Sequence, residues 1–285
     1  MNGHDTPGNI GWYPGHMAKA RRFIAESMKL VDFCIELRDS RIPRSSSNPN
    51  IDALIGEKPR FVLLTKSSLS DRAATEEWIK HLSRRYESIA IDSKTLMGLS
   101  AFIDRVPEVM AERLEQNRRR MITRPLRAMV LGITNVGKST FFNAMSRSKK
   151  AKVENRPGVT RGTQWIKTPY GLELLDTPGL LWEKIESEET AFMLAATGAI
   201  RDEVFDTIHI ARKLCEVLAQ QYPELLKTRY RLDTVVCDGT ELFNSVAKKR
   251  GFLVSGGEID EERCAACLLD EFRAGKIGRI TLEKA

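Results

Sequence analysis

A glycine-rich segment near the middle of the chain has the residue types and spacing that bind phosphate. Gly132 and Gly137 lie five residues apart and are followed by Lys138 and Ser139, in the pattern G-x-x-x-x-G-K-S. Glycines allow backbone N–H groups to point at phosphate oxygens, and a helix that begins at the lysine adds the positive end of its dipole. An ordinary glycine turn is the alternative, but the apolar run before the motif and the helical pattern after it favour phosphate binding.

This phosphate loop also predicts individual roles. Lys138 can reach the outer phosphates of a nucleotide, where its charge would assist catalysis, and the Ser139 hydroxyl can coordinate Mg²⁺. The nucleotide-binding residues expected here are Asn135, Val136, Gly137, Lys138, Ser139 and Thr140.

A second motif supplies a candidate metal ligand. Asp176 follows the apolar run 172–175 and begins the segment D-T-P-G, which ends at Gly179. An aspartate that ends a buried strand can hold Mg²⁺, and the Gly179 N–H can donate to a terminal phosphate. Proline and glycine also form ordinary turns, but the position of Asp176, 44 residues after Gly132, favours a role in the same site.

The polar stretch 156–163 between these two motifs is too irregular for a helix or a strand. We interpret it as a mobile switch segment. Thr160 within it is the candidate for the second protein ligand of Mg²⁺, so the predicted metal set is Ser139, Thr160 and Asp176.

The candidate base-binding residues stand upstream of the phosphate loop. A GTPase needs a base-reading loop, usually Asn-Lys-x-Asp after a strand, and no segment after residue 180 fits that pattern. Two upstream strand-like runs, 60–64 and 88–91, end in polar residues that we assign to base binding: Thr65, Lys66, Ser67, Ser68, Asp92 and Ser93. This order indicates a circularly permuted GTPase, because a ligand depends on arrangement in space and new termini are tolerated at exposed loops.

The motifs resemble those of the ribosome biogenesis GTPase A (YlqF-like) family of circularly permuted GTPases. The resemblance covers nearly the whole chain and rests on W-Y-P-G-H-M-A-K-A at 12–20, D-S-R-I-P at 39–43, N-V-G-K-S-T at 135–140, R-P-G-V-T at 156–160 and L-D-T-P-G at 175–179, with further matches at 197–200 and 250–257. It implies a GTP hydrolase that binds GTP or GDP with Mg²⁺ and acts late in assembly of the bacterial large ribosomal subunit, with hydrolysis stimulated by the particle. The implied partners are the large-subunit precursor and rRNA, with no DNA and no membrane, for a cytoplasmic protein that is monomeric off the ribosome.

The chain departs from the family pattern in the base-reading loop. Thr65 and Ser68 replace the asparagine and the aspartate, so the carboxylate that selects guanine over adenine is absent. A serine cannot form the same charge-assisted pair of hydrogen bonds, which weakens discrimination by about 1–3 kcal/mol. Asp71 could substitute for it, and backbone N–H groups near Asp92 could still read the guanine carbonyl. GTP stays the expected ligand, bound with lower affinity.

Hydrolysis requires an oriented water, and Leu180 occupies the position where many GTPases have a glutamine. The resemblance makes His16 the candidate for this catalytic role, while a helix-capping or packing role is the alternative. Asn135 matches a position that helps to hold K⁺ in related GTPases, with hydrogen bonding inside the loop as the alternative.

The pattern of apolar residues predicts the elements that position these groups. We expect strands at 31–38, 60–65, 88–92, 127–133, 163–168 and 172–176. They alternate with a helix of about 13 residues that begins near Met17 and with helices near 72–85, 100–117 and 139–147. The fold class is therefore α/β: a circularly permuted P-loop GTPase domain with a doubly wound, mostly parallel sheet over residues 1–186, joined internally by a linker at 118–127. Residues 187–285 predict a small all-α C-terminal domain, interpreted as the RNA- and ribosome-binding domain.

Composition agrees with this reading. The chain has 285 residues, 42% of them hydrophobic, no run of 18 apolar residues, and five scattered cysteines that do not form a disulfide framework. Cys264-x-x-Cys267 has no second pair, which argues against a zinc site. The net charge of +7 is unevenly spread, because residues 1–189 have 31 Lys and Arg against 23 Asp and Glu, while residues 190–285 have 14 against 15. Basic patches suit an RNA backbone, although solvated helix faces explain such runs nearly as often.

Other function classes stay open at this stage. The chain could be a nucleotide-dependent RNA-binding scaffold or an NTPase with relaxed base specificity, because its base-reading loop is degenerate. Intact Lys138, Ser139 and Asp176 favour the enzyme. A small-molecule kinase is disfavoured by the D-T-P-G segment and by the lack of an arginine-rich lid.

Overall fold

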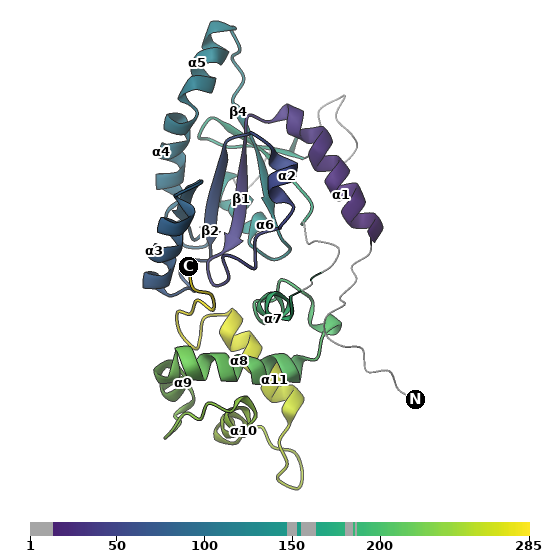
Figure 1. Cartoon of the computed structure of the whole chain (residues 1–285), viewed down its shortest axis with the longest axis vertical. Helices are drawn as coiled ribbons and strands as arrows, with labels where there is room; N and C mark the ends of the chain where they lie inside the picture. Colours follow the sequence, from purple (N-terminus) through teal and green to yellow (C-terminus); the bar gives the residue numbers. More distant parts are fainter. Residues whose placement is uncertain (1–13, 147–152, 155–163, 180–184, 186) are drawn as a thin grey trace. The chain divides into compact units, whose positions relative to one another are not determined.

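The structure is a computed structural model that describes residues 14–146, 153–154, 164–179, 185 and 187–285 (Figure 1). Thr160 and Leu180 lie outside the described residues, as does the side chain of His16. The chain divides into two compact units. Among the described residues, the sheet unit comprises 14–68, 72–146, 153–154, 164–179 and 283–285, and the helical unit comprises 69–71, 185 and 187–282. This division differs from a single boundary after residue 186, because two short segments change sides.

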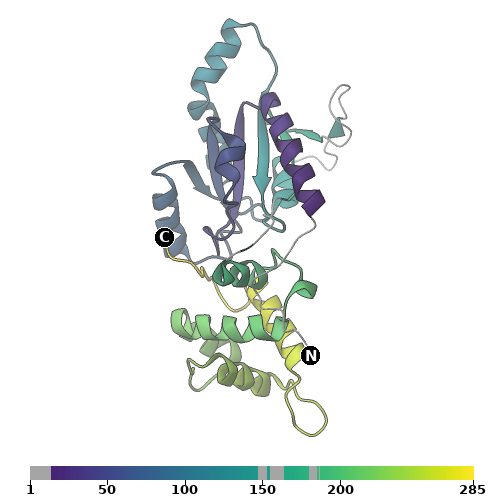
Figure 2. The ribbon, with the colours of Figure 1, turned by 45° about the vertical axis from the view of Figure 1, so that its right-hand side comes forward.

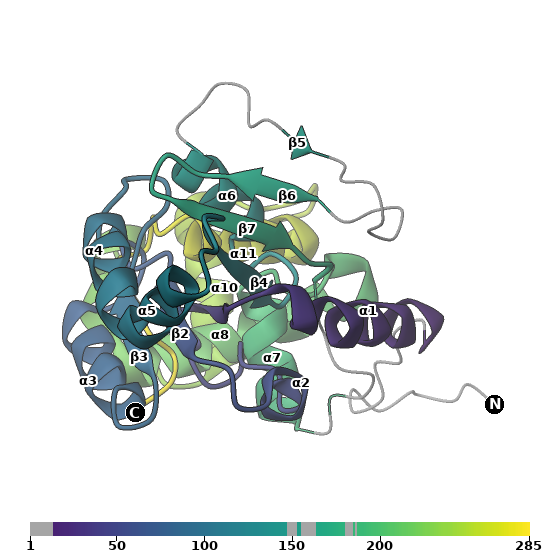
Figure 3. The ribbon, with the colours of Figure 1, turned by 90° about the horizontal axis from the view of Figure 1, so that it is seen from above.

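A seven-stranded sheet forms the centre of the sheet unit, in the spatial order β3-β2-β1-β4-β7-β6-β5. Five neighbouring strands from β3 to β7 run parallel, and β6 and β5 continue the sheet in antiparallel pairs (Figure 3). The strands are β1 Phe33–Asp39, β2 Arg60–Thr65, β3 Glu87–Ala90, β4 Leu126–Gly132, β5 Val153–Glu154, β6 Trp165–Lys167 and β7 Leu172–Asp176. The α/β fold class is thus confirmed, with the phosphate-loop strand β4 between β1 and β7.

Helices cover both faces of this sheet. The helices of the unit are α1 Pro14–Ser27, α2 Ile51–Ile55, α3 Arg72–Leu82, α4 Leu99–Val109, α5 Ala111–Arg119 and α6 Lys138–Ser146, with the short 3₁₀ helix Met28–Leu30 after α1. On one face, α1 and α2 pack on Cys34, Met129 and Leu175, and α3 packs on Val62 and Leu64. On the other face, a row of edge-to-face aromatic rings joins the sheet to α4 and α6: Phe33, Phe61, Phe102 and Phe141. Figure 3 shows α1 and α6 on opposite sides of the strands.

The buried strands explain why the sequence folds in this way. Every residue of β1 is buried, and β2 and β4 are nearly continuous buried runs, as expected of central parallel strands covered on both faces. The strand predicted at 31–38 is present as β1, and its polar residues Glu36 and Arg38 are buried with their partners. The single helix expected at 100–117 is instead two helices that meet at Met110, with Pro107 in the last turn of the first.

The helical unit is built around α8. Its elements are α7 Glu188–Ala196, the 3₁₀ helix Asp202–Val204, α8 Thr207–Gln221, α9 Pro223–Tyr230, α10 Gly239–Arg250 and α11 Glu261–Arg273 (Figure 2). Helix α8 packs against the other four helices. Aspartates cap α8, α10 and α11, since the side chains of Asp206, Asp238 and Asp260 accept hydrogen bonds from the first backbone N–H groups.

The segment Leu69–Asp71 joins the helical unit through its backbone. The Ile280 N–H donates to the Leu69 carbonyl oxygen at 3.0 Å, and the Asp71 N–H donates to the Thr281 hydroxyl at 3.2 Å. Over the described part of the chain, no helix has the length and apolar character needed to cross a membrane.

Candidate nucleotide-binding site

The phosphate loop, residues 132–139, connects the end of β4 to the start of α6, as the motif requires. Gly137 has a φ of +109° and Asn135 one of +55°, so the loop turns its backbone through conformations that few residues adopt. The Lys138 ammonium group folds back over the loop and donates to the carbonyl oxygens of Gly132 at 3.0 Å and Ile133 at 2.8 Å. The loop thus has the backbone shape and the lysine of a phosphate cradle.

The first base-reading loop, residues 65–68, is joined to the phosphate loop. The Thr65 hydroxyl lies 2.7 Å from the Val136 carbonyl oxygen and 3.0 Å from that of Arg38. The Lys66 ammonium group donates to the Asn135 carbonyl oxygen at 2.7 Å. Two regions 69 to 71 residues apart in the chain therefore form one structure. Thr65 performs a linking role with a hydroxyl where the family pattern has an asparagine amide.

A buried charge cluster holds Lys66 in position. The Asp39 carboxylate pairs with Lys66 at 2.9 Å and with the Arg41 guanidinium at 2.7 Å, and it also accepts the Arg41 backbone N–H. Burial works to raise the pKa of the Asp39 carboxyl, but the charges of Arg41 and Lys66 hold that pKa well below its usual range. Asp39 and Arg41 belong to the D-S-R-I-P segment that resembles the family, but no role is predicted for them from the sequence. Their position directly after a predicted strand is the feature that could have indicated one.

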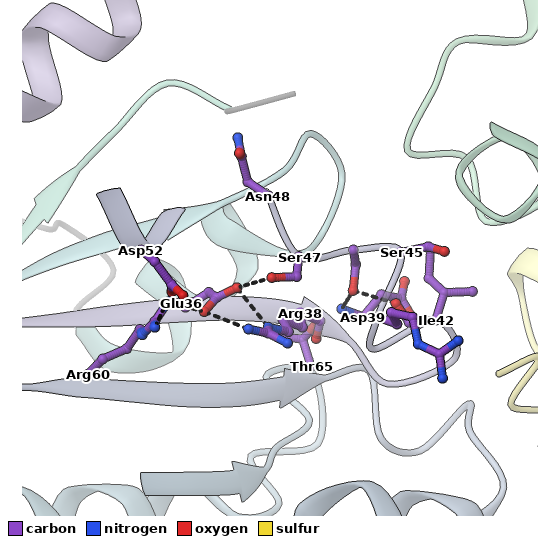
Figure 4. Close-up of polar contacts among 12 residues, drawn as sticks. Glu36, Arg38, Asp39, Ile42, Ser45, Ser47, Asn48, Asp52, Arg60 and Thr65 are labelled. Atoms are coloured by element: carbon purple, nitrogen blue, oxygen red, sulfur yellow. Dashed lines mark hydrogen bonds and ion pairs between the residues drawn. The ribbon is translucent and has the colours of Figure 1, made fainter. Parts of the chain in front are cut away.

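A second charge network lies on β1 before Asp39, around Glu36. Figure 4 shows Glu36 facing Arg38 and Ser47. The buried Glu36 carboxylate accepts from Arg38 at 2.7 Å, from Arg60 at 3.2 Å and from the Ser47 hydroxyl at 2.9 Å. Arg60 also pairs with Asp52 of α2 at 2.5 Å. The network fixes the loop after β1 against β2, so it supports the strand ends that carry Asp39 and Thr65. No local pattern predicts this network, because a glutamate in a strand is normally assigned to solvent.

The second base-reading loop, residues 92–98, follows β3. Asp92 begins it, and a bridge between Asp92 and Met97 closes it. Gly98 has a φ of +75°, and a Cβ there would lie 2.1 Å from the Ala90 carbonyl oxygen, so only glycine fits. The buried Ser93 hydroxyl makes no hydrogen bond within the described residues. Asp92 lies beside Ser68, so the structure brings the two base-reading segments together.

The D-T-P-G segment approaches the phosphate loop from the β7 side. Asp176 ends β7 next to β4, and the Thr177 hydroxyl donates to the Val130 carbonyl oxygen at 2.6 Å. A Cβ on Gly179 would lie 2.9 Å from the Thr134 Cγ2 atom and 3.3 Å from the Lys138 Nζ atom. Because Gly179 has no side chain, its backbone can lie close to the Lys138 ammonium group.

Burial shifts the titration of the two charged groups in this part of the site. It lowers the pKa of Lys138 to about 8, against the opposing effect of Asp176. It raises the pKa of Asp176, against the opposing effect of Lys138. Both groups thus lie where charge is poorly solvated, and each would gain from a ligand of opposite sign.

The donors present fit Mg²⁺ bound with a nucleotide. Ser139 follows Lys138 in the first turn of α6, and Asp176 supplies a carboxylate whose pKa is raised by burial against the opposing charge of Lys138. Hydroxyl and carboxylate oxygens are the ligands that this hard cation takes from protein. Thr160, the third expected ligand, lies outside the described residues.

His16 and Asp71 are the remaining residues that the sequence predicts for the site. His16 lies in the first turn of α1, and its side chain is not among those described. Asp71, the alternative source of a base-reading carboxylate, belongs to the helical unit, whereas Ser68 belongs to the sheet unit.

A family model, curated relatives and solved structures all match this chain. The family described as 50S ribosome-binding GTPase matches residues 127–234. Ribosome biogenesis GTPase A of Priestia megaterium is 43% identical over 277 residues, which cover 96% of each chain, and the protein of the same name from Thermotoga maritima is 29% identical over 275 residues, which cover 96% of this chain and 94% of that one. The crystal structure of GNP-bound YlqF from T. maritima has a TM-score of 0.63 and 25% identity, covering 93% of this chain and 98% of that one. The GDP-bound structure of YlqF is similar at a TM-score of 0.62 and 25% identity, covering 92% and 98%.

Proposed function

This chain belongs to the ribosome biogenesis GTPase A family and is a GTP hydrolase, and from that premise we propose that it acts late in the assembly of the bacterial large ribosomal subunit. The observation that carries the proposal is the joining of Thr65 and Lys66 to the phosphate loop, within a chain that matches its relatives over almost its whole length. Such an assembled site can bind a guanine nucleotide and change with its phosphates. The protein would work in the cytoplasm, where these subunits are built.

Chemical roles follow from the geometry of the sheet unit. Lys138 provides positive charge for the outer phosphates, and the Gly179 N–H provides a donor next to it. Ser139, Thr160 and Asp176 would hold Mg²⁺, which when bound neutralises charge on the phosphates. The exposed Asn135 is the proposed K⁺ contact.

His16 is the proposed group that orients the attacking water. It lies at the start of α1, a helix that packs on the sheet through Ala20 and Ile24. A helix anchored in this way can bring its first turn to a defined place once nucleotide and particle are bound. Turnover would then depend on the ribosomal particle.

The proposed RNA-binding residues belong to the segment 187–285 and, separately, to the basic excess of the sheet unit. Not every arginine of that excess is available, because Arg113 and Arg124 pair with the buried Asp32 at 3.0 and 2.7 Å. Exposed arginines remain at 118–120, at the end of α5, and Lys19 is exposed on α1. Such a surface would bind rRNA in a salt-dependent way, with no requirement for DNA or a membrane. We propose that the chain is a monomer when it is off the ribosome.

Sedimentation tests the proposal. The full chain, loaded with GTP or GDP and Mg²⁺, is layered with mature or precursor large subunits, and release of phosphate is measured with and without them. We expect GTP-dependent cosedimentation with the precursor and faster hydrolysis. Lys138→Ala should abolish both, while Glu77→Gln on the exposed face of α3 should change neither. Equal cosedimentation with GTP, GDP and no nucleotide would reject a nucleotide-controlled assembly role.

Ser68 favours one alternative, an NTPase of relaxed base specificity or a nucleotide-dependent RNA scaffold, because it stands where a guanine-reading carboxylate is usual. The discriminating measurement is the ratio of GTP to ATP affinity. Comparable affinities would support the alternative.

A further inference from the structure

Ser68 and Asp92 form a hydrogen-bonded pair at the position where the base is read. The Ser68 hydroxyl donates to the Asp92 Oδ2 atom, and the Ser68 backbone N–H lies 3.4 Å from the same oxygen. The other carboxylate oxygen, Oδ1, accepts the backbone N–H groups of Lys94 at 2.8 Å and Thr95 at 3.1 Å. The pair therefore ties the first base-reading loop to the second.

The ionisation of Asp92 determines the direction of the bond. Burial works to raise the pKa of this carboxyl, but the Ser68 hydroxyl and the backbone N–H groups of Thr95 and Lys94 hold the pKa below its usual value. A charged carboxylate has no proton to give. Ser68 must therefore donate its single proton to Asp92, and its oxygen keeps only acceptor positions for any other partner.

Ser68 and Asp92 differ in their exposure to solvent. Asp92 is 3% exposed, whereas Ser68 is half-buried and can be reached by a ligand. Lys66, two residues before Ser68, contacts the phosphate loop, so Ser68 lies on the same segment that borders the nucleotide. A ligand would thus meet the serine oxygen, with the charge of Asp92 behind it.

We propose that Ser68, held as an acceptor by Asp92, reads the guanine N–H edge in place of the missing aspartate. The proposal rests on the guanine-nucleotide site described above and names the residues that set its specificity. Ser68 touches the base, and Asp92 is a positioning residue that acts through it. Charge assistance strengthens the Ser68 oxygen as an acceptor beyond that of an isolated hydroxyl.

This arrangement predicts a distinct pattern of base selection. Guanine and hypoxanthine present an N1–H donor to the reading position, whereas adenine presents an unprotonated N1 acceptor. An acceptor-only oxygen therefore favours the first two and rejects adenine. Because one oxygen cannot span N1 and the 2-amino group as a carboxylate does, loss of the 2-amino group should matter little. IDP should accordingly bind within a few-fold of GDP.

Titration calorimetry of the full chain with GDP, IDP and ADP tests the pair. In Ser68→Ala, affinity for GDP and IDP should fall about tenfold and affinity for ADP should stay unchanged. Asp92→Asn keeps an acceptor for the loop N–H groups, but its amide can donate to Ser68 and free the serine proton to point at the base. The ratio of GDP to ADP affinity should then fall at least about tenfold. Ser68→Asp combined with Asp92→Asn should restore that ratio. The double variant places a carboxylate at position 68, where it can accept from the base, and it removes the second negative charge at position 92.

Two controls separate specificity from loss of structure. Binding of pyrophosphate should be equal in the parent and in all variants, because the phosphate loop is untouched. Asp71→Asn should leave the GDP to ADP ratio unchanged. An unchanged ratio in Asp92→Asn, or a collapse of the ratio in Asp71→Asn, would overturn the assignment. Failure of the parent itself to bind GDP would reject the proposed function instead.

Discussion

The Thr65 hydroxyl lies 2.7 Å from the Val136 carbonyl oxygen, and this contact joins the base-reading loop to the phosphate loop. Thr65 ends β2 and Val136 precedes the last glycine of the phosphate loop, and a second hydrogen bond, from Lys66 to the Asn135 carbonyl oxygen, lies beside this one. Two side chains thereby connect loops whose order in the chain is reversed relative to most GTPases.

Replacing the hydroxyl tests the connection. Thr65→Val keeps the shape of the side chain but removes the donor, so the Val136 carbonyl loses its partner within the buried end of β2. We expect a loss of about 1–2 kcal/mol in the free energy of nucleotide binding, or roughly tenfold in Kd. Thr65→Ser retains the hydroxyl and should bind GDP like the parent. Equal Kd values for the valine and serine variants in calorimetry would contradict the linking role.

Asp39 should be among the most sensitive positions in the sheet unit. Asp39→Asn leaves the buried Arg41 and the partly exposed Lys66 without their carboxylate, so the free energy of unfolding should fall by about 3–5 kcal/mol. Urea unfolding of the full chain measures this. Glu76→Gln removes an exposed partner of Arg72 and should cost less than about 1 kcal/mol. Similar losses for the two variants would show that the cluster has no special role.

The same cluster predicts how stability depends on pH. Because the folded pKa of Asp39 is lower than that of the unfolded chain, its contribution is present above the unfolded pKa and is lost as pH falls through the folded pKa. Stability of the parent should therefore fall below pH of about 4, and Asp39→Asn should weaken that dependence.

The sequence was sufficient for the α/β class and for the order of loops around the site, since glycine spacing and apolar runs are local signals. It was not sufficient for the clusters that hold the loops. Glu36 reads as a solvent-facing strand residue because its partners, Arg60 and Ser47, come from other segments. The pairing of Ser68 with Asp92 joins positions 24 residues apart and depends on how β2 and β3 lie side by side. Such contacts depend on tertiary structure, which no local pattern contains.

Lys138 should make nucleotide binding depend on pH. Its pKa is about 8 in the free protein, and phosphate oxygens beside it would raise that value in the complex. Binding therefore takes up about half a proton at pH 8 and almost none at pH 6.5, and GDP affinity declines toward tenfold per unit above pH 8. Calorimetry in buffers of different ionisation enthalpy measures the proton uptake. Constant affinity from pH 7 to 9 without proton uptake would contradict the shifted lysine.

The role of His16 separates binding from turnover. A residue that orients the attacking water contributes only when the bond to phosphate breaks, so His16→Ala should leave the Kd for GTP within about twofold and lower kcat by about 100-fold or more. His81→Ala, on the exposed face of α3, should change neither quantity. His16→Gln should recover part of kcat, because an amide can also hold a water. The measurement is single-turnover release of phosphate with large subunits present. Equal turnover in His16→Ala and the parent would reject the catalytic role and leave His16 as a residue that only begins α1.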